Sequence, residues 1–160
     1  MADLEKLLAD GLLAGYAGKS TFEHVHRGPF EGEQSLLTPK GGVYIDQWFA
    51  SLRGGGQELA QNEDGKATRL YAGGTIDPEE LSKLGIMEQQ VSERLKRAIT
   101  KLGSKTRLRE DCIPEADGDW QYSYRILDSV DQIDLTIGME QIRFRGEVVF
   151  AHGFLLSPVK

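Results

Sequence analysis

The sequence is short of cysteine and of long apolar runs. Cys112 is the single cysteine among 160 residues, so a disulfide within the chain is excluded and a thiolate metal site is not expected. A lone cysteine without secretory features fits a reducing compartment. No stretch reaches the roughly 20 apolar residues of a membrane helix, and the first residues carry acids where a signal peptide would be basic. We therefore expect a cytoplasmic protein with no membrane contact.

An excess of basic charge is also missing. The net charge is -6 at pH 7, which argues against general nucleic-acid binding because such proteins usually present a basic face. The densest basic run extends from Arg94 to Arg109. We interpret it as the solvated face of a helix and its exit loop.

Motifs of nucleophilic, phosphate-binding and metal chemistry are absent or incomplete. There is no G-x-S-x-G elbow. Gly54-Gly55-Gly56 leads into a predicted strand, whereas a phosphate loop needs glycines before a helix. His24 and His26 would lie on one side of an extended segment, but we interpret them as surface histidines of a polar loop. We expect no metal and no cofactor.

A weak internal repeat is the most informative feature that is present. Each copy has an amphipathic helix, an aromatic-rich run and then a hairpin whose first strand contains G-x-E. The matching segments are Gly56-Gln57-Glu58 and Gly138-Met139-Glu140, with turns at Asp64-Gly65 and Arg145-Gly146. Such a repeat fixes architecture. It predicts a single domain, residues 1–160, with two pseudo-symmetric helix-plus-three-strand halves at about 3–76 and 77–160.

The spacing of apolar residues predicts the individual elements. A helix is expected over 3–13, a loop over 19–42 with short extended pieces at 22–26 and 34–38, and a short helix starting at Asp77-Pro78. A longer helix, Met87 to Leu102, carries a stripe of Val91, Leu95 and Ile99. Three strands are expected in each half, those of the second being 120–127, 132–144 (broken at Gly138) and 147–156. This order is typical of an α+β fold with a mostly antiparallel sheet and helices packed on it.

Aromatic and acidic residues of the predicted strands are the candidate site. Strand aromatics usually fill a core, but on a concave face they also line small-molecule pockets. Our leading hypothesis is a non-enzymatic small-ligand-binding or regulatory module with a pocket between the halves. The candidate ligand-binding residues are Tyr44, Trp48, Glu58, Tyr71, Tyr122, Tyr124 and Glu140.

Two alternatives stay open. Glu58 and Glu140 occupy matching places in the repeat, so a hydrolase-like enzyme could use them as paired carboxylates. The plainer interpretation has both pointing outward and pairing with Arg69 and Arg143. The second alternative is a protein-interaction module, which would show a contiguous exposed apolar patch. The sequence does not decide between a monomer and a homodimer, and it does not identify a ligand.

The dispersed motifs resemble those of a bacterial family of domains of unknown function. The resemblance covers about Leu8 to the end and rests on Tyr44-Ile45-Asp46, Gly56-Gln57-Glu58, Gly65-Lys66, Tyr71-Ala72-Gly73, Gly118-Asp119-x-x-Tyr122, Gly138-x-Glu140-x-Ile142, Gly146 and Val149-Phe150. The chain departs from the pattern at Arg53-Gly54-Gly55, where the family has an aromatic residue. That family occurs alone or behind a Cro/CI-type helix-turn-helix domain. The resemblance implies a bacterial intracellular module with a sensory role, and it transfers no catalytic residue.

Overall fold

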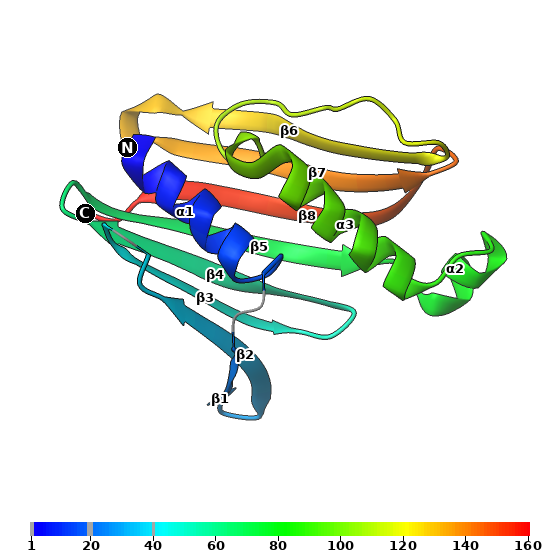
Figure 1. Ribbon diagram of the computed structural model, residues 1–160, viewed down its shortest axis with the longest axis horizontal. Coiled ribbons are helices and arrows are strands. Elements are labelled where there is room, and N and C mark those ends of the chain that lie inside the picture. The colour runs from blue at the N-terminus through cyan, green and yellow to red at the C-terminus, as the bar shows by residue number, and fades with distance from the viewer. Residues whose placement is uncertain (1, 19–20, 40) are drawn as a thin grey trace.

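The computed structural model describes residues 2–18, 21–39 and 41–160 and confirms an α+β fold with one antiparallel sheet (Figure 1). The helices are α1 (Ala2–Ala14), α2 (Pro78–Lys83) and α3 (Glu88–Leu102), with short 3-10 turns at Gly103–Lys105 and Asp131–Ile133. The strands are β1 (Glu23–Arg27), β2 (Phe30–Leu37), β3 (Val43–Ala50), β4 (Arg53–Asn62), β5 (Gly65–Thr75), β6 (Trp120–Val130), β7 (Leu135–Phe144) and β8 (Glu147–Pro158).

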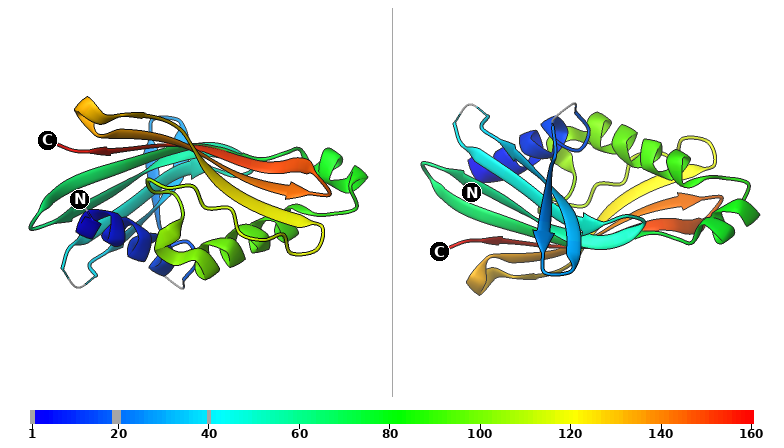
Figure 2. Two further views of the ribbon diagram at one scale, coloured as in Figure 1. Left: turned by 90° about the horizontal axis from the view of Figure 1, so that it is seen from above. Right: turned by 90° about the horizontal axis from the view of Figure 1, so that it is seen from below.

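The eight strands lie in the order β1-β2-β3-β4-β5-β8-β7-β6, and every neighbouring pair is antiparallel. The β5–β8 pairing therefore joins a five-strand meander to a three-strand meander. Helices α1 and α3 lie on the same face of the twisted sheet, and α2 extends beyond one end of it (Figure 2). We call the face that α1 and α3 cover the inner face.

Regular alternation of side chains produces the core between sheet and helices. In β7 every second residue is buried, as expected when one face of a strand is covered. The α3 stripe of Val91, Leu95 and Ile99 is buried, as the sequence predicted. Helix α1 approaches β3 closely because Gly11 has no side chain, and a Cβ there would come within 2.2 Å of the Tyr44 ring.

The short extended pieces expected at 22–26 and 34–38 coincide largely with strands β1 and β2, but the expectation of a loop between them is wrong. Residues 23–37 form the hairpin of β1 and β2, and β2 pairs with β3 from Glu33–Trp48 to Leu37–Tyr44. Gly28, which looked like a breaker, lies in the turn of this hairpin with a φ of +61°. The first part of the chain thus has five strands where three were expected.

Two local predictions are also corrected. Strand β7 runs through Gly138 without a break, because the glycine stays extended and its missing side chain leaves room for the Tyr124 ring. Asp77 stands at the N-cap of α2, but its carboxylate makes no cap hydrogen bond and instead accepts one from Nη2 of Arg53 at 2.6 Å. Helix α2 therefore begins at Pro78 without a side-chain cap.

Candidate functional site

The central strands gather charged residues on the inner face of the sheet. Glu58 of β4 lies directly opposite Arg69 of β5, and Glu140 of β7 lies opposite His152 of β8. Directly opposite residues of antiparallel strands point to the same face, and both glutamates are fully buried. The interpretation that they point outward is therefore wrong.

Glu58 is held inside the sheet by an arginine of the next strand. Arg69 donates from Nη2 to Oε1 at 2.6 Å and from Nε to Oε2, and Tyr44 donates from its hydroxyl to Oε1 at 2.7 Å. Burial, the largest single influence, pushes the pKa of Glu58 upward, but the charge and hydrogen bonds of Arg69, the charge of Arg107 and the Tyr44 hydroxyl together leave the pKa below its ordinary value. We call Glu58 and Arg69 the strand pair, and it is ionised.

Glu140 is held by an arginine from outside the sheet. Arg107 donates from Nε to Oε1 at 3.0 Å and from Nη2 to Oε2 at 2.7 Å, and Tyr122 donates to Oε1 at 2.6 Å. Arg107 belongs to the segment 106–119, which we call the connector. The φ of Arg107 is +61°, an uncommon value for a residue with a side chain. Arg107 is 5% exposed, so the solvated-face interpretation of the basic run is wrong at this position.

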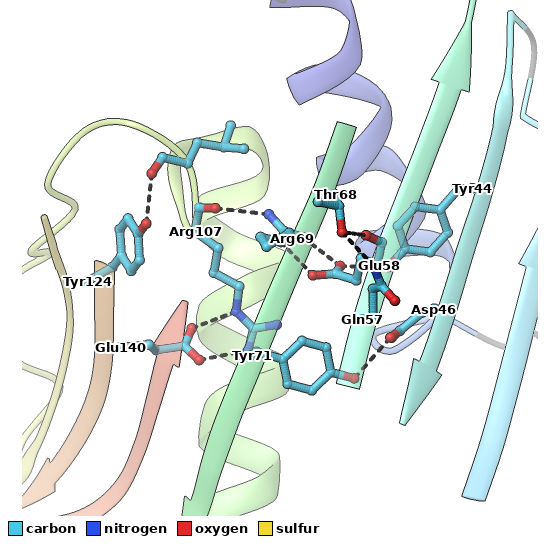
Figure 3. Close-up of polar contacts among 11 residues, drawn as sticks. Tyr44, Asp46, Gln57, Glu58, Thr68, Arg69, Tyr71, Arg107, Tyr124 and Glu140 are labelled. Atoms are coloured by element: carbon cyan, nitrogen blue, oxygen red, sulfur yellow. Dashed lines mark hydrogen bonds and ion pairs between the residues drawn. The ribbon is translucent and has the colours of Figure 1, made fainter. Parts of the chain in front are cut away.

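The strand pair and the connector pair, Glu140 and Arg107, are linked through the backbone. Arg69 donates from Nη1 to the carbonyl oxygen of Arg107 at 3.0 Å, so all three guanidinium nitrogens of Arg69 are bonded. Among the described residues, Nη1 of Arg107 has no hydrogen-bond partner. The close-up shows this arrangement, with the Arg107 guanidinium next to the ring of Tyr71 (Figure 3).

Asp46 is the third buried acid of the cluster. Its Oδ1 accepts a hydrogen bond from the Tyr71 hydroxyl at 2.9 Å, and no Lys, Arg or His of the described residues forms an ion pair with it. Burial, followed by repulsion from Glu58, raises the pKa of Asp46 to about 7. Asp46 can therefore gain or lose a proton near neutral pH.

A cavity of about 200 Å³ lies beside these groups, between the inner face and the helices. Arg107, Asp46 and Glu58 reach it, and aromatic side chains line much of the rest. Gly54 and Gly73, which pair across β4 and β5, contribute no side chain to it. The other lining residues are Leu12, Tyr16, Trp48, Ala50, Ser51, Leu52, Gly55, Tyr71, Gly74, Thr75, Glu88, Ser92, Leu95, Phe150 and His152.

His152 contributes a second polar atom without a partner. Its Nδ1 is buried and has no hydrogen bond within the described part of the chain. Burial, helped by the charge of Arg107, lowers the pKa of His152 to about 4. The imidazole is thus neutral at physiological pH and can offer one donor and one acceptor. Unsatisfied buried polar atoms are rare, so this one needs an explanation.

The structure brings three of the seven predicted site residues to the cavity: Trp48, Glu58 and Tyr71. Tyr44 donates to Glu58, and Tyr122 donates to Glu140, which holds Arg107. Tyr124 donates to the carbonyl oxygen of Leu108 at 2.7 Å. The sequence analysis missed Asp46, Arg107 and His152. Asp46 and His152 could have been found, since each lies two residues from a predicted aromatic residue of its strand and therefore faces the same side of the sheet. Arg107 gave no such signal because it lies in the connector.

A larger cleft, of about 480 Å³, lies between α3 and the connector, and Tyr122 reaches it. We favour the smaller cavity as the site because both arginines of the cleft are already paired. Arg94 and Arg97 both bond the Asp117 carboxylate, and Arg94 also stacks over the Trp120 ring at 5.2 Å. These contacts engage the two guanidinium groups of the cleft without a ligand.

The described residues show neither a metal-binding cluster nor a membrane-spanning helix. They contain no group of three or more His, Cys, Asp or Glu placed to hold a metal ion, and His24 and His26 lie on the edge strand β1. No helix within 2–18, 21–39 and 41–160 has the length and apolarity to cross a membrane. Comparison of the chain with known protein families, with curated proteins and with solved structures found no match.

Proposed function

We propose that the protein is a non-enzymatic small-ligand-binding module and that its ligand occupies the cavity between the inner face and the helices. The observation that carries the proposal is that two polar groups at this cavity, the buried Nδ1 of His152 and Nη1 of Arg107, have no hydrogen-bond partner within the described residues. Aromatic walls with a few convergent polar groups are typical of ligand pockets. A cavity of about 200 Å³ suits a metabolite of a few heavy atoms.

The enzyme alternative has less support. Glu58 and Glu140 share the inner face, as paired catalytic acids would, but each is clamped by two guanidinium nitrogens and a tyrosine hydroxyl. A general acid or base must be free to exchange its proton with a substrate. Both carboxylates are committed to structural ion pairs, which favours binding over catalysis.

A regulatory role fits the domain organisation of the family that the sequence resembles, because some of its members follow DNA-binding domains. Ligand binding in such a module would report a metabolite to a partner domain or protein. We propose this role for a cytoplasmic protein, with the ligand as the signal.

A thermal-shift screen with a metabolite panel tests the binding proposal. A ligand at about 100 times its dissociation constant raises the free energy of unfolding by about 2.7 kcal/mol. Ser92 lines the cavity from α3, so Ser92→Phe should fill it and abolish the shift. Ser82→Phe, on the exposed side of α2, is the matched control and should keep it. A panel without hits, or hits that survive Ser92→Phe, would refute the proposal.

The second candidate function is self-association through the outer face of the sheet. Leu59, Leu70 and Leu155 lie on neighbouring strands there and are 37%, 41% and 40% exposed. Gln57 and Thr68 lie among them, so the centre of the face carries no charge and two copies could meet without like-charge repulsion. Light scattering after size exclusion should give a dimer mass that Leu70→Lys reduces to that of a monomer. A monomer at high concentration would exclude this candidate.

We also propose that the two sets β3-β4-β5 and β6-β7-β8 descend from one repeated unit. Gly56 and Glu58 are the fourth and sixth residues of β4, counted from Arg53, and Gly138 and Glu140 hold the same places in β7, counted from Leu135. Each glutamate accepts a bond from a tyrosine of the preceding strand, Tyr44 or Tyr122. Neither half, 3–76 or 77–160, should melt cooperatively alone. A cooperative melt of either would contradict a shared core.

A further inference from the structure

The buried cluster beside the cavity contains three acids, Asp46, Glu58 and Glu140, but only two arginines to pair with them. Glu58 is matched by Arg69 and Glu140 by Arg107, each through two hydrogen bonds. Asp46 is 7% exposed and has only the neutral Tyr71 hydroxyl as its partner among the described side chains. A buried carboxylate is costly unless a cation pairs with it. Asp46 can avoid this cost by taking up a proton, in keeping with its raised pKa, or by pairing with a cation that a ligand supplies.

Aromatic rings surround the position that such a cation would take. Tyr71 reaches Asp46 with its hydroxyl and lines the cavity with its ring. Trp48 follows Asp46 on the same face of β3 and also lines the cavity. Aromatic faces attract ammonium groups, most strongly where water is excluded. Asp46 with these two rings is therefore suited to an organic ammonium ion.

The other end of the cavity offers a donor instead of an acceptor. Glu140 occupies Nε and Nη2 of Arg107, and the guanidinium is further fixed at 4.9 Å over the Phe154 ring. No group of the described residues bonds Nη1, which can therefore donate to a ligand, and the Arg107 guanidinium lies across the Tyr71 ring from Asp46 (Figure 3). A ligand along Tyr71 would thus meet an anion at one end and a hydrogen-bond donor at the other.

We propose that the cavity binds a small primary amine whose ammonium group pairs with Asp46 and whose other end carries a carbonyl or carboxylate oxygen that accepts from Arg107. This inference rests on the proposed ligand-binding function and gives it a ligand class. Amino acids of short chain and amino amides share this chemistry. The neutral His152 can donate to the same oxygen or accept from a ligand amide.

Binding should be linked to pH through Asp46. Its pKa is raised to about 7, so an ammonium ligand must displace a proton at lower pH. The affinity for a primary amine that stays protonated over this range should then rise about tenfold between pH 6 and pH 8. The charged and titratable groups facing Asp46 or the cavity are Tyr44, Glu58, Arg69, Tyr71, Arg107, His152, Tyr16 and Glu88.

Calorimetric titration with four probes of one chain length tests the class: butylammonium, 4-aminobutanoate, butanoate and 1-butanol. We expect both amines to bind at least tenfold more tightly than butanoate and 1-butanol. The amino acid should exceed butylammonium at least threefold, and this preference reports on Arg107 in the unaltered protein. Butanoate or 1-butanol binding as tightly as butylammonium would overturn the amine class.

Asp46→Asn separates this inference from the general function. It should weaken butylammonium binding at least tenfold and remove its pH dependence, whereas Asp119→Asn, an exposed acid paired with Arg145, should leave both unchanged. Unchanged binding in Asp46→Asn overturns the inference. If the metabolite panel yields only neutral or anionic ligands that Ser92→Phe abolishes, the binding function stands and the amine class falls. If nothing binds, both fall.

Discussion

The strand pair and the connector pair use the same chemistry but differ in where the arginine comes from. Arg69 stands opposite Glu58 in a neighbouring strand, is fully buried and has every guanidinium nitrogen bonded. Arg107 reaches Glu140 from a connector with a positive φ and keeps one nitrogen unpartnered among the described residues. The strand pair is therefore a closed structural unit. Both pairs reach the cavity, the strand pair through Glu58 and the connector pair through Arg107, but only Arg107 keeps a nitrogen that the described residues leave unbonded.

The largest expected difference between the two pairs is the loss of unfolding free energy when the arginine of each is replaced. Arg69→Met leaves Glu58 buried without a counter-charge and should cost about 3–5 kcal/mol of unfolding free energy. Arg107→Met should cost less, because water entering the cavity can reach Glu140. Urea denaturation measures both. Arg145→Met, which removes an exposed pair with Asp119, should cost less than about 1 kcal/mol. Equal losses for Arg69→Met and Arg145→Met would contradict the closed unit.

The two titrating groups at the cavity should give opposite slopes of stability against pH. The pKa of Asp46 is raised from 3.8 to about 7, so the folded state binds the extra proton in this window and stability falls as pH rises. The pKa of His152 is lowered from 6.5 to about 4, so the unfolded state binds the extra proton and stability rises with pH. Between pH 5 and 6.5 the two effects oppose each other.

Single substitutions should expose each slope. Over those 1.5 pH units, Asp46→Asn should show unfolding free energy rising by up to about 2 kcal/mol relative to the unaltered protein. His152→Asn should show it falling by a similar amount. Urea denaturation at several pH values measures both. Parallel curves for the two variants and the unaltered protein would show that neither group titrates as inferred.

The glycines of the two G-x-E motifs sharpen the comparison at the level of packing. A Cβ on Gly56 would lie 2.5 Å from the Tyr71 hydroxyl, and one on Gly138 would lie 2.3 Å from that of Tyr124. Gly56→Ala and Gly138→Ala should each cost about 1–3 kcal/mol through overpacking. Gly56→Ala alone should weaken binding at the cavity, because Tyr71 lines it. Equal binding in both variants would separate Tyr71 from the site.

The smallest expected effect concerns the backbone of Arg107. With a φ of +61°, this residue occupies a region that glycine adopts without strain. Arg107→Gly and Arg107→Ala lose the same ion pair, but the glycine variant should be more stable by about 1 kcal/mol. Thermal unfolding of the two variants side by side measures the difference. A more stable alanine variant would show that the connector relaxes out of this conformation.

Local sequence patterns predicted the α3 stripe, the two hairpins that contain G-x-E and the pairing of Glu58 with Arg69, because these depend on spacing along one element or across one hairpin. They did not predict the burial of Glu58 and Glu140, because that burial depends on segments distant in the sequence. Much of 19–42 looked like a loop since glycine and proline are frequent there, and its strand character comes from the pairing of β1 with β2 and of β2 with β3. Arg107 looked solvated because its partner Glu140 lies 33 residues away. The arginine that holds Glu140 was therefore missed.

The position of β8 has a consequence for how the chain is made. It follows all the other strands in sequence, yet it lies in the interior of the sheet between β5 and β7. During translation, the meander β1–β5 and the hairpin β6–β7 must each present an unpaired edge until β8 leaves the ribosome. Exposed edges template aggregation. Nascent chains stalled before Glu147 should therefore depend on chaperones, and release from that dependence should coincide with synthesis of β8.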